Sequence, residues 1–119
     1  MGIFLKDINL KGKTALITGA TKGLGRGAAI AIAEAGGNII AVGRNQSELN
    51  TLKKEIKKLK VNYISFNCDV NNYSRMKSFI SKQKKLDILV NNAGTNMPES
   101  FLNVKKSSLE TLLNVNTKA

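Results

Sequence analysis

The sequence has 119 residues, of which 42% are hydrophobic and 23% are charged, and its formal net charge at pH 7 is +11. This length allows a single domain, and the composition excludes a disordered chain. No stretch approaches the roughly 18 consecutive apolar residues that a membrane span requires. We therefore expect one soluble folded domain over residues 1–119 with no membrane partner.

The excess of basic residues is also typical of nucleic-acid-binding proteins. However, the densest basic run, residues 53–60, continues the apolar spacing of Leu49, Leu52, Ile56 and Leu59. This spacing predicts an amphipathic helix whose lysines face solvent. The two tyrosines and four phenylalanines are not interleaved with the basic clusters, as a base-stacking platform requires. We therefore expect no nucleic-acid partner.

Cys68 is the single cysteine of the sequence and lies in an apolar segment. One cysteine cannot form an internal disulfide, nor can it form a zinc site by itself. A lone thiol fits a reducing compartment. The cysteine content therefore predicts a cytoplasmic protein with no bound metal.

Apolar runs and helical periodicities alternate along the chain. Asn45, followed three residues later by Glu48, predicts a capping box at the start of the amphipathic helix. In chain order we expect a strand at 14–18, a helix at 23–35, a strand at 38–42, a helix from the cap to residue 60, a strand at 61–68, a helix at 72–83, a strand at 86–90 and a last helix from 107 or 108 to 119.

This alternation predicts an α/β fold, in which helices cover both faces of a doubly wound, Rossmann-like parallel sheet. In such sheets, ligands bind at the carboxyl ends of the strands, next to the point where the strand order reverses. Residues that directly follow each strand are therefore the first candidates for a functional site.

A glycine-rich segment, residues 18–25, follows the first strand and reads Thr-Gly-Ala-Thr-Lys-Gly-Leu-Gly. Gly19 would permit the tight turn, Gly23 would let backbone approach a phosphate, and Gly25 would allow close packing of helix against strand. The following helix would offer its N–H groups and positive dipole end to an anion. The alternative is a glycine-rich connector that holds no ligand.

The spacing Thr-Gly-x-x-x-Gly-x-Gly resembles the glycine motif of the short-chain dehydrogenase/reductase family. Three further segments resemble the family's pattern in the same order: Asp69 after the third strand, Asn-Asn-Ala-Gly at 91–94 after the fourth, and Asn116 on the last helix. The resemblance extends along essentially the whole chain. It implies an NAD(P)-binding Rossmann-type domain that corresponds to the N-terminal half of the family's fold.

The resemblance also implies which residues would contact the cofactor. Asn116 matches the family's structural and catalytic asparagine. The implied cofactor contacts are Gly19, Thr21, Lys22, Gly23, Leu24 and Gly25 around the phosphates, Arg44 and Asn45 near the adenosine 2′-phosphate, Asp69 and Val70 at the adenine, and Asn92, Ala93 and Gly94 along the ribose. Two alternatives stay open: Asp69 could instead satisfy amides at the next helix start, and Asn91 could simply tie its strand to neighbouring backbone.

The end of the second strand indicates the choice of cofactor. NAD-preferring folds usually place Asp or Glu about 20 residues beyond the glycine turn, where it accepts a hydrogen bond from the 2′-hydroxyl. This chain has Gly43, Arg44 and Asn45 there, and Lys22 adds a second cation. A guanidinium can bind a phosphate that a carboxylate would repel, so NADP(H) is favoured over NAD. Alternatively, Arg44 faces solvent or stacks on the adenine of either cofactor.

The family's catalytic Ser, Tyr and Lys have no counterparts in the matching positions of this chain. Tyr73 and Lys77 have Tyr-x-x-x-Lys spacing, but they lie at the start of the third helix, far from the expected nicotinamide, and we reject them. We expect a natural chain about twice as long. The present sheet would then stop after the fourth strand and the start of the fourth helix, with an unpaired edge, poor stability and no activity by itself.

The sequence thus predicts an NADP(H)-dependent oxidoreductase that transfers hydride between nicotinamide and a carbonyl or alcohol substrate. The opening residues 4–13 and the stretch 94–98 resemble sugar-acid or 3-oxoacyl-thioester reductases of the family. A full-length homo-oligomer, either a dimer or a tetramer, is expected. The alternative is a non-catalytic dinucleotide-binding module or a degenerate fragment.

Overall fold

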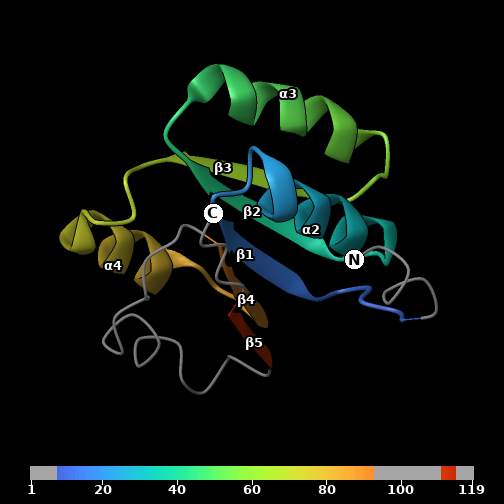
Figure 1. The fold of residues 1–119 in the computed structure, drawn as a ribbon. Coiled ribbons are helices and arrows are strands. Elements are labelled where there is room, and N and C mark those ends of the chain that lie inside the picture. Colours follow the sequence, from blue (N-terminus) through green and yellow to red (C-terminus); the bar gives the residue numbers. More distant parts are fainter. Residues whose placement is uncertain (1–7, 93–110, 115–119) are drawn as a thin grey trace.

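A computed structural model describes residues 8–92 and 111–114 of the chain (Figure 1). Strands and helices alternate along the described part. In chain order the elements are β1 (Thr14–Thr18), α2 (Gly23–Glu34), β2 (Asn38–Gly43), α3 (Gln46–Lys57), β3 (Tyr63–Asn67), α4 (Tyr73–Lys82), β4 (Ile88–Asn91) and β5 (Thr111–Asn114).

The five strands form one sheet in the order β3-β2-β1-β4-β5, and every neighbouring pair is parallel. Ile17 at the centre of the sheet lies opposite Ala41 of β2 and Val90 of β4. The chain moves outward from β1 to β3 and then returns to the other side of β1, so the strand order reverses between β1 and β4. This arrangement confirms the predicted doubly wound sheet.

Helices cover both faces of the sheet, α2 and α3 on one and α4 on the other, so the central strands are buried on both sides (Figure 1). Side chains alternate between the faces along each strand. In β1, Ala15 and Ile17 point toward α2 and α3, whereas Leu16 points toward α4. This two-sided burial is typical of parallel sheets and explains why the strands read as continuous apolar runs.

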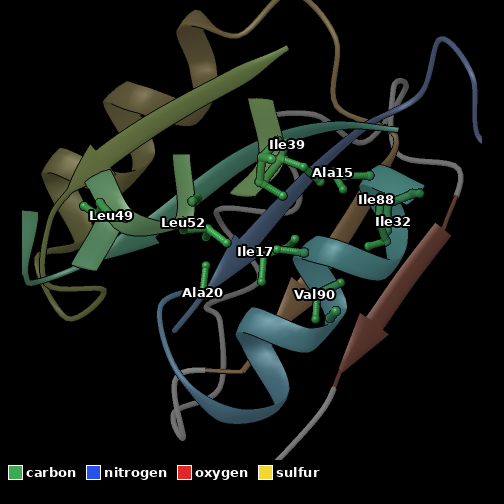
Figure 2. Packing of buried hydrophobic residues seen from close by; sticks show 14 residues of the cluster. Ala15, Ile17, Ala20, Ile32, Ile39, Leu49, Leu52, Ile88 and Val90 are labelled. Atoms are coloured by element: carbon green, nitrogen blue, oxygen red, sulfur yellow. The ribbon is translucent and has the colours of Figure 1, made fainter. Parts of the chain in front are cut away.

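The larger core lies between the sheet and the pair of helices α2 and α3 (Figure 2). Small residues of α2, including Ala28 and Ala29, let this helix approach the sheet closely. Leu49, Leu52 and Ile56 line the buried side of α3, as their spacing predicted. The lysines between them are exposed, which confirms that this basic run is the outer face of an amphipathic helix.

The smaller core lies under α4, on the opposite face of the sheet. Met76 and Ile80 of this helix pack with Leu16, Ile40 and Leu89 from three central strands. At the outer margin the rings of Phe66 and Phe79 stack with centroids 4.1 Å apart. This packing fixes α4 beside β3, and thereby the turn that leads from β3 into α4.

Asparagine side chains cap the N-termini of two helices, α3 and α4. Asn45 accepts a hydrogen bond from the Glu48 N–H at 3.0 Å, and Asn72 accepts one from the Arg75 N–H at 3.3 Å. The predicted cap at Asn45 is thus confirmed. No helix within residues 8–92 is both long enough and apolar enough to cross a membrane.

Most element boundaries differ little from the expected ones. β1 has the predicted limits, and α2 ends one residue earlier than predicted. α3 ends at Lys57, before a turn in which Lys60 takes a left-handed backbone conformation with φ of 61°. The strand predicted at 61–68 is shortened to Tyr63–Asn67, because β2, its neighbour among the described strands, pairs with it only from Ile39 to Gly43.

The last predicted element, a helix, is a strand over the residues that the structure describes. We expected a helix from 107 or 108 to 119, but residues Thr111–Asn114 form the strand β5, which pairs with β4 from Ile88 to Asn91. The prediction of an unpaired edge at β4 is therefore also wrong for these residues. A parallel partner satisfies the outward backbone groups of β4, and this non-local gain outweighs the local helical pattern. The remaining residues of that expected helix lie outside the described part.

The edge strand provides a pH-dependent contact. The Tyr63 hydroxyl donates a hydrogen bond to the Leu49 carbonyl at 2.8 Å, and burial raises the pKa of Tyr63 to about 12. An unfolded tyrosine titrates near pH 10, so this contribution is fully present below about pH 10 and is lost as the pH rises toward 12.

We predict that Tyr63→Phe is less stable than the wild type by about 1 kcal/mol at pH 8, the contribution of one hydrogen bond. The difference should vanish or reverse at pH 11, because only the wild type must keep a phenol protonated. Urea unfolding of both proteins at the two pH values measures it. Equal stability differences at pH 8 and pH 11 would show that the hydroxyl does not titrate in this way.

Candidate functional site

A pocket of about 420 Å³ opens at the carboxyl ends of the strands, next to the reversal of strand order. Four segments contribute to it: the turn after β1, the end of β2 with the start of α3, the turn after β3, and the residue after β4. The lining residues are Gly19, Thr21, Lys22, Val42, Gly43, Arg44, Asn45, Glu48, Cys68, Asp69, Val70, Asn71 and Asn92.

The fold gathers most of the predicted cofactor contacts around this pocket. Gly23, Leu24 and Gly25 are not among the lining residues and instead form the first turn of α2 beside it. Ala93, Gly94 and Asn116 lie outside the described residues. The predicted residues that do line the pocket are Gly19, Thr21, Lys22, Arg44, Asn45, Asp69, Val70 and Asn92.

Two glycines of the turn after β1 adopt backbone conformations that other residues rarely take. Gly19 has φ of 61° and Gly23 has φ of 55°. A Cβ atom at Gly23 would have no atom within 4 Å, so the conformation, and not crowding, requires glycine there. The open space beside Gly23 leaves the backbone accessible at the N-terminus of α2, where helix N–H groups lack partners within the helix.

Gly25 has a different role, because α2 touches the end of β1 there. A Cβ atom at Gly25 would overlap the carbonyl oxygen of Gly19 and lie 2.6 Å from Nδ2 of Asn92. No side chain fits between the helix and the turn. The contact supports the interpretation that this glycine permits close packing of helix against strand.

A short hydrogen-bond chain connects β1 to the last residue of β4 and to the residue that follows it. The buried Thr18 hydroxyl donates to Oδ1 of Asn91 at 3.0 Å and accepts from the Asn92 N–H at 2.9 Å. The Asn92 side chain in turn donates to the Gly19 carbonyl at 3.3 Å. Asn91 therefore links β4 to the neighbouring strand through a side chain, whereas the structural alternative for this residue was a tie to backbone, and Asn92 contacts the glycine turn.

Glu48 projects from the first turn of α3 toward the glycine turn. Its carboxylate accepts a hydrogen bond from the Thr21 hydroxyl at 3.0 Å and lies 3.1 Å from the Lys22 ammonium. The hydrogen bond from Lys22 holds the pKa of Glu48 below its ordinary value. A capping box has two hydrogen bonds, and the structure has only the one from the Glu48 N–H to the Asn45 side chain. The expected return bond from the Glu48 carboxylate is wrong, since this carboxylate binds Thr21 and Lys22 of the glycine turn.

A second ion pair crosses the pocket from β2 to the turn after β3. Arg44 lies 3.6 Å from the Asp69 carboxylate, and its side chain is 75% exposed. Asp69 also accepts a hydrogen bond from the Asn71 N–H at 2.9 Å, while Asn72 caps the following helix. Asp69 thus satisfies a backbone amide near α4, and its carboxylate still faces the pocket.

Several lining residues were not predicted as contacts. Val42 and Gly43 end β2, and Asn71 follows Asp69, so their sequence positions could have suggested them. Cys68 is buried at the wall of the pocket, and this burial raises the pKa of its thiol. Glu48 was predicted as a capping residue, and no local pattern indicates that its carboxylate reaches the turn after β1.

The rejected Tyr-x-x-x-Lys pair lies on α4. Tyr73 is the first residue of this helix and is 52% exposed, and Lys77 follows one turn later. Neither residue lines the pocket formed by the described residues. The pair was rejected because a position on the third helix is far from the expected nicotinamide, and its place on α4 agrees with that reason.

A family model described as short chain dehydrogenase matches residues 13–119. The chain therefore belongs to the short chain dehydrogenase family of oxidoreductases, which confirms the resemblance seen in its motifs.

Individual relatives agree with this assignment. A 2-dehydro-3-deoxy-D-gluconate 5-dehydrogenase of Pseudoalteromonas atlantica is 41% identical over 96 residues, which cover 76% of this chain and 38% of that protein. A 3-oxoacyl-acyl-carrier-protein reductase of Rickettsia conorii is 36% identical over 112 residues, which cover 94% of this chain and 45% of that protein. The chain thus spans less than half the length of these relatives.

A solved structure shows the same fold. The crystal structure of a short chain dehydrogenase from Mycobacterium paratuberculosis bound to NAD matches with a TM-score of 0.68 and 26% sequence identity. The match covers 76% of this chain and 40% of the other.

We predict that Gly25→Ala destabilises the protein by about 3 kcal/mol, because the new methyl group overlaps backbone that cannot move aside. Gly27→Ala is the matched control on the same helix, since its Cβ would meet nothing within 4 Å. That substitution should stabilise the helix by about 0.5–1 kcal/mol. Urea unfolding measures both changes, and equal effects would contradict the packing role of Gly25.

Proposed function

We propose that the pocket binds a nicotinamide dinucleotide, with NADP(H) preferred, and that the whole protein is an oxidoreductase acting on a carbonyl or alcohol substrate. The observation that supports this most directly is the meeting of two cations, Lys22 and Arg44, with the glycine turn at the reversal of strand order. Anionic nucleotides bind parallel sheets at this position.

The pyrophosphate would lie against the turn between Gly19 and Gly25. The open space beside Gly23 fits the close approach of a phosphate to backbone. The N-terminus of α2 adds its N–H groups and the positive end of its dipole. Thr21 offers a hydroxyl in the same turn. Leu24 follows at the start of α2 and is 50% exposed, so it is accessible to a ligand there.

The adenosine would occupy the side of the pocket between β2 and β3. Asp69 and Val70 would contact the adenine, with the Asp69 carboxylate accepting from the amino group. Asn92, Ala93 and Gly94 would follow the ribose. Bound dinucleotide would compete with the present Arg44–Asp69 ion pair, whose 3.6 Å separation and exposure make it a weak contact to replace.

The preference for NADP(H) rests on charge. β2 ends in Gly43 followed by Arg44 and Asn45, where NAD-preferring folds usually carry a carboxylate. Arg44 and Lys22 would bind the 2′-phosphate, which carries close to two negative charges. The short chain dehydrogenase from Mycobacterium paratuberculosis, which has the same fold, was solved bound to NAD.

The chemical step belongs to the whole protein. When bound, the cofactor supplies or accepts hydride at its nicotinamide ring. In this chain Asn116 would take part in the catalytic site, and the family's Ser, Tyr and Lys would come from sequence that does not match residues 1–119. We propose that the 119-residue chain alone is inactive. We also propose that the whole protein is a cytoplasmic homo-oligomer with a small-molecule substrate and no nucleic-acid partner.

We predict that Arg44→Ala weakens NADPH binding about 10- to 100-fold, because a charge-assisted hydrogen bond to a phosphate contributes roughly 1.5–3 kcal/mol. NADH binding should change less than threefold. Titration of the reduced cofactors, followed by their fluorescence, measures both affinities.

The matched control is Arg75→Ala, which removes the same charge from the ring face of Phe66, at a residue that does not line this pocket. It should leave both affinities unchanged. Equal weakening of NADPH and NADH by Arg44→Ala would indicate stacking on adenine and would contradict the assigned phosphate contact. Failure of the unaltered protein to bind either cofactor would contradict the proposed function itself.

A further inference from the structure

We propose that Glu48 is a specificity-determining residue that acts as an internal counter-ion to Lys22 and thereby weakens the preference of the pocket for a 2′-phosphate. This inference rests on the proposed binding of a dinucleotide. It concerns an acidic residue that does not lie at the end of β2, where the acceptor for the 2′-hydroxyl is normally found.

Glu48 is in direct contact with the turn that would hold the phosphates. Its two carboxylate oxygens make separate contacts, Oε1 with the Thr21 hydroxyl at 3.0 Å and Oε2 with the Lys22 ammonium at 3.1 Å. Both partners come from the turn after β1, which lies far from Glu48 in sequence. Glu48 itself lines the pocket, and its side chain is 31% exposed.

Helix capping does not account for this arrangement. The Asn45 side chain already accepts the Glu48 N–H at 3.0 Å and so caps α3. In a capping box the Glu48 carboxylate would bind back to the N–H of Asn45, and here it binds Thr21 and Lys22. The hydrogen bonds of the carboxylate are therefore made to the glycine turn and not to the end of its own helix.

The charge of Glu48 affects the two cofactors differently. A 2′-phosphate that binds Lys22 must displace the Glu48 carboxylate from it. The phosphate also brings two negative charges near that carboxylate. A 2′-hydroxyl meets no such repulsion and can donate a hydrogen bond to a carboxylate. An ordinary glutamate is ionised at neutral pH, and the hydrogen bond from Lys22 lowers the pKa of Glu48 further, so the effect is present under ordinary conditions.

The experiment compares two ligands that differ only in the 2′-phosphate, adenosine 2′,5′-bisphosphate and adenosine 5′-monophosphate. Their affinities are measured by isothermal titration calorimetry for the wild type, Glu48→Gln and Glu55→Gln. Glutamine keeps the shape of Glu48 and an acceptor for Thr21. Glu55 is the matched control, because it lies on the same helix, pairs with Lys58 at 3.6 Å and does not line the pocket.

Glu48→Gln should bind the bisphosphate about three- to tenfold more tightly than the wild type, the range expected when one partly screened charge near a dianion is removed. Its affinity for the monophosphate should change less than twofold, and Glu55→Gln should match the wild type with both ligands. The same substitution in a Lys22→Gln background should give a smaller gain, because the cation that Glu48 neutralises is then absent.

Other outcomes overturn the inference. An unchanged or weaker affinity of Glu48→Gln for the bisphosphate would mean that Glu48 does not compete with the phosphate. An equal gain in Glu55→Gln would mean that only the net charge of the protein matters. Failure of all the proteins to bind either adenosine ligand would overturn the proposed function as well, so the two failures are distinguishable.

Discussion

The close contact between α2 and the end of β1 is the constraint on which the candidate site depends. Gly25 lies against the Gly19 carbonyl and the Asn92 side chain, with no room for a Cβ atom between them. This contact brings the N-terminus of α2 to the carboxyl end of the central strand. Asn92 links the same turn to β4. The glycine turn is therefore held from both sides, and the pocket has a rigid wall before any ligand arrives.

The remaining walls of the pocket carry charges that are already paired. Lys22 contacts Glu48 across the space between α2 and α3, and Arg44 contacts Asp69 across the space between β2 and β3. All four groups are at least partly exposed to solvent, so each pair contributes little to stability. The pairs instead place two cations where a nucleotide phosphate would arrive. When a ligand binds, Lys22 and Arg44 would therefore exchange their carboxylate partners for its phosphates.

The sequence predicts features that depend on neighbouring residues. The limits of β1, the cap at Asn45 and the buried stripe of α3 follow from local patterns, and the structure has all three. Contacts between distant segments are not encoded in such patterns, so the sequence does not reveal that the Glu48 carboxylate turns toward Lys22. β5 is a second example, because a helical pattern at 111–114 gives way to pairing with β4. Eight of the predicted cofactor residues line one pocket, because parallel strands end at the same edge of the sheet.

The ion pairs have a consequence for the kinetics of association. Near the pocket, Lys22 and Arg44 each have a carboxylate beside them, whereas the chain as a whole carries a formal charge of +11. The long-range field that steers an anionic ligand toward the protein therefore arises mainly from lysines outside the pocket, including those on the outer side of α3. Added salt screens this distant field more strongly than contacts within the pocket. The protein would thus separate the capture of a ligand, which depends on ionic strength, from its recognition, which depends on four paired side chains.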